Sequence, residues 1–257
     1  MTTRLFHISD VHFGVEDREA LAVVADAVAR EKPDAVVCTG DVTQRATHRQ
    51  YAAAAEWFSA LEAPVWIDPG NHDMPYRNLF ERFTDPYRRY RKLAGKVAGS
   101  FESDDLVLVP LKSTVRAQGR FPWSDGVVTR KALERTLSRL DQLKGDPRVI
   151  VVTAHHPLLG PEDSGPNPTI GGNRAFAELV AAGADAFLSG HIHQPFDMQR
   201  ERNGQSARMI GAGTLSTRLR HGEPPSYQVI TIERGGKIDT ELRRVGALVR
   251  QTSQAGS

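Results

Sequence analysis

The sequence predicts an α/β fold, in which parallel strands are covered on their faces by helices. In the first 67 residues, three short apolar segments alternate with two helix-type patterns, in the order 5–8, 17–31, 35–38, 48–61 and 64–67. The last third of the chain resumes this alternation and then continues as strand-type segments over residues 195–243. A β-α-β-α-β order favours parallel strands, because each helix carries the chain back across the sheet.

The elements of the first third follow from the spacing of their apolar residues. Residues 17–31 place apolar side chains at helical spacing, at Leu21, Val24, Ala25 and Val28. Pro33 then introduces the second strand. Residues 48–61 are alanine-rich and add larger apolar side chains, at Tyr51, Trp57, Phe58 and Leu61. We therefore expect two helices packed on a sheet of three strands.

The middle of the chain is less regular. Residues 75–94 favour two short helices, because Asp85 and Pro86 supply an N-cap and a first helical position. A strand is expected over the apolar residues 106–111, and a helix over residues 129–143. These elements separate the two regions in which strands and helices alternate.

The last third favours a strand at 148–153, a helix at 173–182 and a strand at 186–188. A chain of 257 residues fits one domain better than two complete ones. We predict a single domain over residues 1–245 with a small helical, cap-like insertion at about 75–97. A flexible tail of small and polar residues is expected at 246–257.

Composition indicates a globular protein without a strong charge bias. Hydrophobic residues make up 40% of the chain and charged residues 25%. The 33 basic and 31 acidic residues leave a net charge of +2, which does not favour nucleic acid as the partner. Cys38 stands alone, so no internal disulfide can form. Neither a signal-peptide core nor an apolar run of about 20 residues is present, so we expect a cytoplasmic protein without membrane insertion and leave its oligomeric state open.

Polar residues follow five of the expected strands, at the point where each strand ends. In open α/β sheets this carboxyl edge is where ligands bind. The residues at these positions combine carboxylates, one amide and several imidazoles, with no thiolate: Asp10, His12, Asp41, Asn71, His155, His191 and His193. Such oxygen and nitrogen donors suit manganese, iron, zinc or cobalt. The sequence therefore predicts a metal centre at this edge.

The number of donors predicts two metal ions rather than one. Seven ligands are too many for a single structural ion, and the two carboxylate oxygens of Asp41 make it the candidate bridge. The spacing of the Asp10–His12 and His191–His193 pairs also fits, because alternate side chains of an extended segment point to the same side. We expect both members of each pair to reach the centre.

Five short blocks of the sequence resemble the signature blocks of the calcineurin-like metallophosphoesterases, in the same order and over roughly residues 4–245. They are Asp10-Val11-His12, Gly40-Asp41, Gly70-Asn71-His72-Asp73, His155-His156-Pro157 and Gly190-His191-Ile192-His193. The resemblance implies a two-sheet β-sandwich flanked by helices, an αββα arrangement. It further implies one metal held by Asp10, His12, Asp41 and His193, and a second held by Asp41, Asn71, His155 and His191.

The resemblance also implies a reaction. Two metals about 3.5–4 Å apart hold a bridging hydroxide for in-line attack on phosphorus, and no covalent enzyme intermediate is needed. His72 is then the expected general acid or oxyanion stabiliser, and Asp73 is expected to orient His72. Arg218 and Arg220 are candidates for gripping the substrate phosphate, and His156 for a further substrate contact.

The substrate class remains the open part of the interpretation. Within the family, the chain resembles compact bacterial phosphodiesterases that act on cyclic nucleotides or glycerophosphodiesters. The alternatives are a phosphomonoesterase, a nuclease, or a scaffold that has kept the fold without catalysis. Aromatic and basic residues interleave over residues 80–96, a combination that can bind nucleic acid. An amphipathic helical surface with a solvated basic face is the favoured interpretation of that segment.

Overall fold

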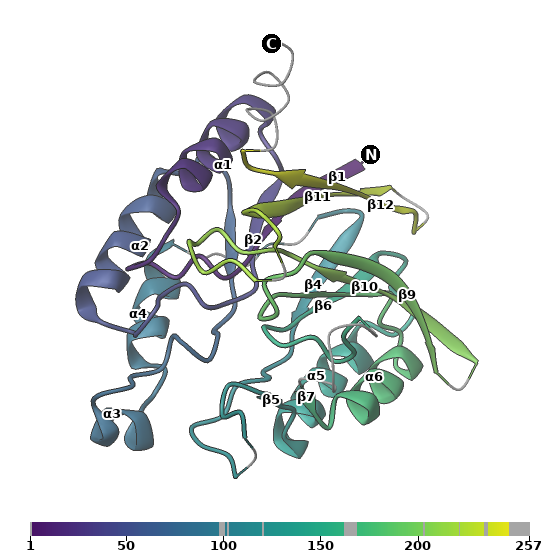
Figure 1. Ribbon diagram of the computed structural model, residues 1–257. Helices are drawn as coiled ribbons and strands as arrows, with labels where there is room; N and C mark the ends of the chain where they lie inside the picture. The colour runs from purple at the N-terminus through teal and green to yellow at the C-terminus, as the bar shows by residue number, and fades with distance from the viewer. Residues whose placement is uncertain are drawn as a thin grey trace.

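Two five-stranded β-sheets lie face to face at the centre of the protein, and helices cover both outer faces (Figure 1). The computed structural model describes residues 2–97, 101, 103–119, 121–161, 169–202, 204–220, 222–233 and 236–246. Residues 247–257, most of the predicted tail, lie outside the described residues.

The first sheet has the strand order β12-β11-β1-β2-β3. Its strands are β1 (Thr2–Ile8), β2 (Ala35–Cys38), β3 (Val65–Ile67), β11 (Ser226–Glu233) and β12 (Ile238–Arg244). β1, β2 and β3 run parallel, as the first third of the sequence predicts. β11 returns antiparallel beside β1 and pairs with β12.

The second sheet has the order β4-β6-β8-β10-β9. Its strands are β4 (Leu106–Pro110), β6 (Val149–Thr153), β8 (Ala186–Ser189), β9 (Phe196–Arg202) and β10 (Gln205–Gly211). All are parallel except β9, which pairs antiparallel with β10. A small parallel pair stands apart, formed by β5 (Gly126–Val127) and β7 (Thr169–Ile170).

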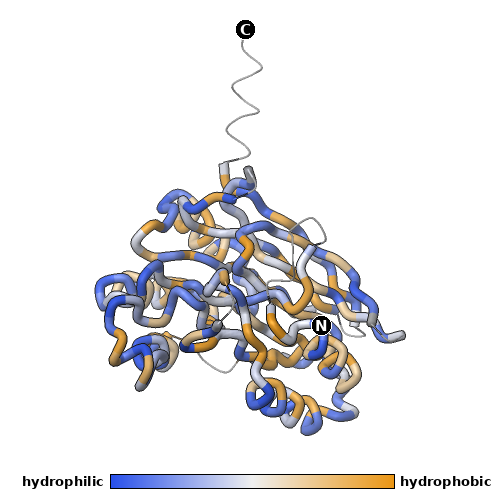
Figure 2. Tube along the Cα trace, turned by 60° about the horizontal axis from the view of Figure 1, so that its bottom comes forward, coloured by the Kyte–Doolittle hydropathy of each residue, from blue (hydrophilic) through white to orange (hydrophobic). Residues whose placement is uncertain are grey.

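Six helices complete the described fold: α1 (Arg18–Glu31), α2 (His48–Ala60), α3 (Leu79–Thr84), α4 (Arg88–Val97), α5 (Arg130–Gln142) and α6 (Gly172–Ala181). α1, α2, α5 and α6 each bury one apolar side. Hydrophilic and hydrophobic residues are accordingly interspersed along the chain (Figure 2). None of the described helices has the length and apolar character needed to cross a membrane. α3 and α4 occupy the region where two short helices were expected.

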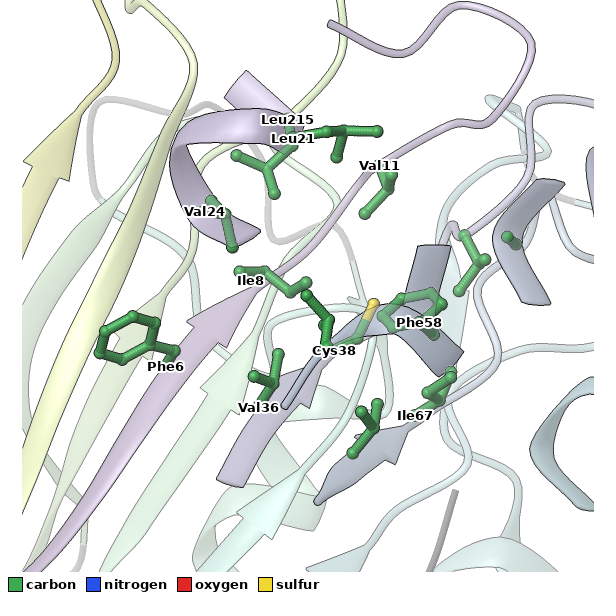
Figure 3. Packing of buried hydrophobic residues seen from close by; sticks show 14 of the residues in the cluster. Phe6, Ile8, Val11, Leu21, Val24, Val36, Cys38, Phe58, Ile67 and Leu215 are labelled. Atoms are coloured by element: carbon green, nitrogen blue, oxygen red, sulfur yellow. The ribbon is translucent and has the colours of Figure 1, made fainter. Parts of the chain in front are cut away.

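Three apolar clusters fill the spaces between the layers, and together they show the αββα order. The first cluster contains Phe6 and Ile8 of β1 together with apolar residues of α1 and α2, and Cys38 of β2 lies beside Phe58 (Figure 3). Leu5, which alternates with these residues along β1, belongs instead to the cluster between the two sheets. A third cluster joins the second sheet to α5 and α6. The predicted α/β fold and the two-sheet sandwich are thus confirmed.

Candidate metal centre

Loops from both sheets bring the predicted ligands together. The loops after β1, β2 and β3 of the first sheet carry Asp10, His12, Asp41 and Asn71. The loops after β6 and β8 of the second sheet carry His155, His191 and His193. All seven residues are at most 9% exposed. The site therefore lies at the seam between the sheets, with donors from each.

One group of donors surrounds Asp10. Its Oδ1 lies 3.1 Å from Nε2 of His193 and 3.6 Å from Nε2 of His12. The two imidazole Nε2 atoms are 3.2 Å apart. The Oδ1 atom is buried, yet no donor among the described residues reaches it with hydrogen-bond geometry. A buried oxygen between two imidazole nitrogens fits coordination of a shared cation.

A second group of donors lies on the other side of Asp41. Its Oδ2 is 3.4 Å from Nε2 of His155 and 3.8 Å from Nε2 of His12. The side-chain oxygen of Asn71 is 3.1 Å from the same His155 nitrogen. His191 lies beside this group, with its ring centroid 5.2 Å from that of His155. One Asp41 oxygen thus faces donors of both groups.

The backbone of this site differs from the extended segments expected for the Asp-x-His and His-x-His pairs. The ligand candidates with a left-handed backbone are Asp10 (φ 52°), His12 (φ 51°), Asp41 (φ 51°), His191 (φ 72°) and His193 (φ 59°). The expectation of extended segments was therefore wrong, although the structure does bring both members of each pair to the site. Left-handed conformations are costly for residues with a side chain and cluster at functional sites.

Glycines precede three of the ligands because the loops approach closely there. A Cβ on Gly70 would lie 2.1 Å from Oδ1 of Asp41, and one on Gly190 would lie 2.5 Å from Oδ2 of Asp10. A Cβ on Gly40 would lie 2.8 Å from both the Gly70 nitrogen and Nδ1 of His155. Any larger residue would therefore displace the ligand that it touches.

Backbone groups orient the ligand side chains. Nδ1 of His155 lies 2.8 Å from the Thr39 carbonyl, and Nδ1 of His193 lies 2.7 Å from the Arg218 carbonyl. Because a carbonyl can only accept, each Nδ1 carries the proton and each Nε2 keeps its lone pair for a metal. The carboxylates are fixed in the same way, since Oδ2 of Asp10 accepts from the His191 amide at 2.8 Å.

The electrostatics of the site favour cations. Burial alone would raise the pKa of Asp10 and of Asp41, but the neighbouring histidines, chiefly His193 and His155 respectively, hold both pKa values well below their usual range. Without a bound cation, burial alone would lower the pKa of His155, but Asp41 raises it to about 9, so a metal that binds Nε2 must displace a proton from it. Two ionised carboxylates in a dry site need positive charge nearby.

His72 has a different orienting partner from the one predicted. Its Nδ1 lies 2.8 Å from the Gln44 carbonyl, so this nitrogen is the donor. Asp73 accepts instead from the amides of Val42, Thr43 and Gly70, at 3.1, 2.8 and 2.9 Å. The expected contact between Asp73 and the His72 ring is therefore corrected, because Asp73 is fully occupied in joining two ligand-bearing loops.

The three candidate substrate residues lie in different surroundings. The Nη1 of Arg218 is 3.3 Å from Nε2 of His72 and 3.5 Å from Nε2 of His12, so its guanidinium lies at the edge of the site. Arg220 is exposed. The ring of His156 is buried, with Nδ1 2.9 Å from the Ser113 hydroxyl and Nε2 2.9 Å from the Ser124 carbonyl. Both of its nitrogens are thus bound within the protein.

Two residues beside the site carry no motif and were missed from the sequence. The side chain of Gln44 accepts from Arg218 at 3.3 Å while its carbonyl holds His72. The ring of Tyr76 lies 5.6 Å from the ring of His72. Only their nearness in sequence to the motif blocks could have indicated them, since Gln44 follows Gly40-Asp41 and Tyr76 follows the block from Gly70 to Asp73.

Comparison with known proteins supports the resemblance to the calcineurin-like metallophosphoesterases by an independent route. The family model described as calcineurin-like phosphoesterase matches residues 3–195. A probable cyclic nucleotide phosphodiesterase of Pseudoalteromonas sp. (strain SM9913) is 29% identical over 209 residues, which cover 76% of this chain and 73% of that protein. A 3',5'-cyclic adenosine monophosphate phosphodiesterase of Pseudomonas aeruginosa is 26% identical over 271 residues, which cover 95% and 91%.

Among solved structures, a dimetal phosphatase from Danio rerio superposes with a TM-score of 0.62. The match covers 93% of this chain and 98% of that one at 14% sequence identity. At this identity, the likeness shows the fold.

Proposed function

Because the chain belongs to the calcineurin-like phosphoesterase family, we propose that it hydrolyses small phosphodiesters at a centre of two metal ions. The observation that carries the proposal is the position of Asp41, whose Oδ2 faces Nε2 of His12 on one side and Nε2 of His155 on the other. A carboxylate in that position suits a bridge between two cations. Seven buried oxygen and nitrogen donors around it fit two coordination shells better than one.

The family resemblance suggests how the ligands divide between the two ions, and the grouping of Asp10, His12 and His193 supports this division. Asp10, His12, Asp41 and His193 would hold one ion, and Asp41, Asn71, His155 and His191 the other. The donor set suits manganese, iron, zinc or cobalt. When bound, such a pair neutralises charge on the phosphoryl oxygens and supplies a water that ionises near neutral pH. The protein's own contribution is to hold the donors in a dry, rigid site.

His72 and Arg218 are the groups that would meet the ester next to the metals. Gln44 fixes the His72 ring through Nδ1, so Nε2 is the atom that faces the departing oxygen, and it delivers a proton when the ring is a doubly protonated imidazolium. Arg218 lies beside that nitrogen and presents positive charge to the same region. We assign proton delivery or oxyanion stabilisation to His72 and phosphate binding to Arg218. Asp73 is a positioning residue, because it ties the loop of Asp41 to the loop of Asn71.

The proposed substrate is a small phosphodiester of the cyclic-nucleotide or glycerophosphodiester type. Relatives named as cyclic nucleotide phosphodiesterases support the first class. The family assignment by itself leaves phosphomonoesters and nucleic acids as competing substrates. A substrate panel that includes all four classes decides between them.

The test is hydrolysis of bis(p-nitrophenyl) phosphate with and without manganese and a chelator. We expect metal-stimulated turnover that the chelator abolishes. His72→Ala should keep its bound metal and lose turnover by about 10²–10⁴-fold, as is usual for a general acid. Asp41→Ala should lose metal and turnover together. Absence of turnover with every divalent metal would overturn the proposal, and unchanged turnover in His72→Ala would overturn the role of His72.

A further inference from the structure

A pocket of about 630 Å³ opens directly beside the metal centre. Asn71, one of the ligand candidates, and His156 lie in its lining. Its walls carry large apolar side chains from two separate segments, and we call it the aromatic pocket: Tyr76, Leu79, Phe83 and Trp123. Any group bound here would lie next to an ester held at the metals.

The walls of the aromatic pocket are apolar but are not part of a core cluster. Phe83 of α3 is 53% exposed and Trp123 is 76% exposed. Large apolar side chains that line a hollow and remain in contact with water mark a binding surface, since a ligand gains free energy by covering them. Planar rings gain further from stacking on aromatic side chains. The pocket therefore suits a flat, apolar group.

Two arginines hold the walls of the pocket together. Arg82 donates through Nε to the Arg116 carbonyl at 2.8 Å, and Arg116 donates to the Phe83 carbonyl at 2.6 Å. α3 and the loop before β5, which lie at the same end of the protein in Figure 1, are joined by these two bonds. A pocket fixed in this way loses little entropy when a ligand binds.

The same arginines give the pocket a positive charge. Among the described residues, neither Arg82 nor Arg116 forms an ion pair, and both guanidinium groups donate to backbone carbonyls. Asp125 is the one acidic residue of the described lining, so the two arginines outnumber it. Their charge is left to attract an anionic substrate. An aromatic wall with an excess of positive charge matches a molecule that combines a planar ring with a phosphate.

Tyr76 links the pocket to the reaction centre. The Tyr76 ring lies 5.6 Å from the His72 ring at an interplanar angle of 37°. The Arg82 guanidinium lies over the Tyr76 ring, 5.5 Å from its centroid. The chain from His72 through Tyr76 to Arg82 runs from the metal centre to α3. A substituent attached to the reacting phosphorus would extend along this line.

We infer that the aromatic pocket binds one ester substituent of the substrate and selects diesters in which that substituent is a planar, apolar ring. The inference rests on the proposed function and adds specificity residues, Phe83 and Trp123, to the same site. Glycerol-type diesters, which have no ring, gain nothing from these walls.

The test compares an aryl diester with a ringless one in matched variants. Phe83→Ala and Trp123→Ala should lower kcat/KM for bis(p-nitrophenyl) phosphate by about tenfold, a loss in the range measured for removal of an aromatic stacking partner. Their kcat/KM for glycerophosphoethanolamine should stay unchanged. Phe80→Ala and Phe121→Ala are the controls, since these rings are 80% and 84% exposed, lie in the same two segments and do not line the pocket. Both controls should match the wild type on both substrates.

A binding measurement distinguishes a failure of this inference from a failure of the proposed function. Calorimetry on the metal-loaded protein should show tighter binding of phenylphosphonate than of methylphosphonate, and the difference should disappear in Trp123→Ala. Tighter phenylphosphonate binding without turnover of any diester would overturn the proposed function and support the pocket. If the wild type hydrolyses diesters and the pocket variants lose kcat/KM equally for both substrates, or lose none, the result would support the proposed function and overturn the pocket inference.

Discussion

At the scale of single residues, the candidate metal centre depends on backbone conformations that most residues avoid. Five ligand candidates have a left-handed backbone, at a cost of about 1–2 kcal/mol each. The surrounding loops hold this conformation, since the His12 amide donates to the Asp41 carbonyl at 2.9 Å and the Asp10 amide to the Gly40 carbonyl at 3.1 Å. Strain at these positions is maintained by neighbours that leave no free space.

Gly190 is the position where this close packing can be tested. In Gly190→Ala the new methyl would lie 1.8 Å from the Ser9 hydroxyl and 2.5 Å from Oδ2 of Asp10, so Asp10 must move. We expect loss of bound metal and a loss of stability of about 1–3 kcal/mol from overpacking. Metal analysis and thermal unfolding measure both.

Gly95 is the matched control. It lies in α4, and a Cβ there would meet nothing within 4 Å. Gly95→Ala should therefore keep the metals and gain about 0.5–1 kcal/mol of helix stability. If Gly190→Ala binds metal as the wild type does, the close approach at Asp10 is not what positions this ligand.

The convergence of the candidate ligands could be predicted from the sequence, but their local geometry could not. The position of Asp41 after a strand and the identity of its side chain are both visible in a single sequence. The contact between His72 and the Gln44 carbonyl is not, because a backbone oxygen 28 residues away leaves no mark on the pattern. For this reason the sequence predicted Asp73 as the group that orients His72, whereas the structure shows the Gln44 carbonyl in that position.

At the scale of elements, α4 holds the loops around the site with one side and presents the expected solvated basic face, with Arg88, Arg91, Lys92 and Lys96, on the other. Tyr90 donates to the Ile67 carbonyl at 2.6 Å, Arg89 to the Ala46 carbonyl at 2.6 Å, and Tyr87 to the Thr114 carbonyl at 3.1 Å. Glu81 of α3 accepts from Arg88 and Arg89. Much of the aromatic and basic pattern over residues 80–96 is therefore used inside the molecule.

Glu81 offers a test of this arrangement, because its buried carboxylate joins α3 to α4. Glu81→Gln should lower the free energy of unfolding by about 2 kcal/mol, the size of a hydrogen bond to a charged group. Burial would raise the pKa of Glu81, but hydrogen bonds from Arg89 and Arg88 lower it below its ordinary value. The stabilisation is then complete above the ordinary glutamate pKa of about 4.3 and is lost as pH falls through the lowered folded-state pKa.

Denaturant unfolding of both proteins at several pH values measures this difference. The gap between wild type and Glu81→Gln should be widest near neutral pH and narrow in acid. Glu134→Gln is the control, because its pair with Arg130 is exposed to solvent and should contribute little to stability. A gap that is independent of pH would contradict the charge-based account.

At the scale of the whole molecule, the site depends on contacts that a single sequence does not specify. The run of strand-type segments over residues 195–243 divides between the sheets, since β10 pairs with β8 while β11 pairs with β1. The β1–β11 register joins Thr2 to Glu233, almost the full length of the chain. Apolar alternation predicts each strand, but the partner of a strand is decided by tertiary packing.

The proposed metals would bind donors from both sheets, so they should stabilise the assembled sandwich and not only the loops. Ligands that bind the folded state alone add RT ln(1 + [L]/Kd), about 4 kcal/mol at a thousandfold excess over Kd. For a chain of this size that corresponds to a rise in Tm of roughly 10 °C. Calorimetry of metal-loaded and chelated protein measures the shift. Asp41→Asn should lose it while Glu81→Gln keeps it, because only the first variant changes a group that faces donors from both sheets. Equal Tm values for the loaded and chelated wild type would contradict a centre built from both sheets.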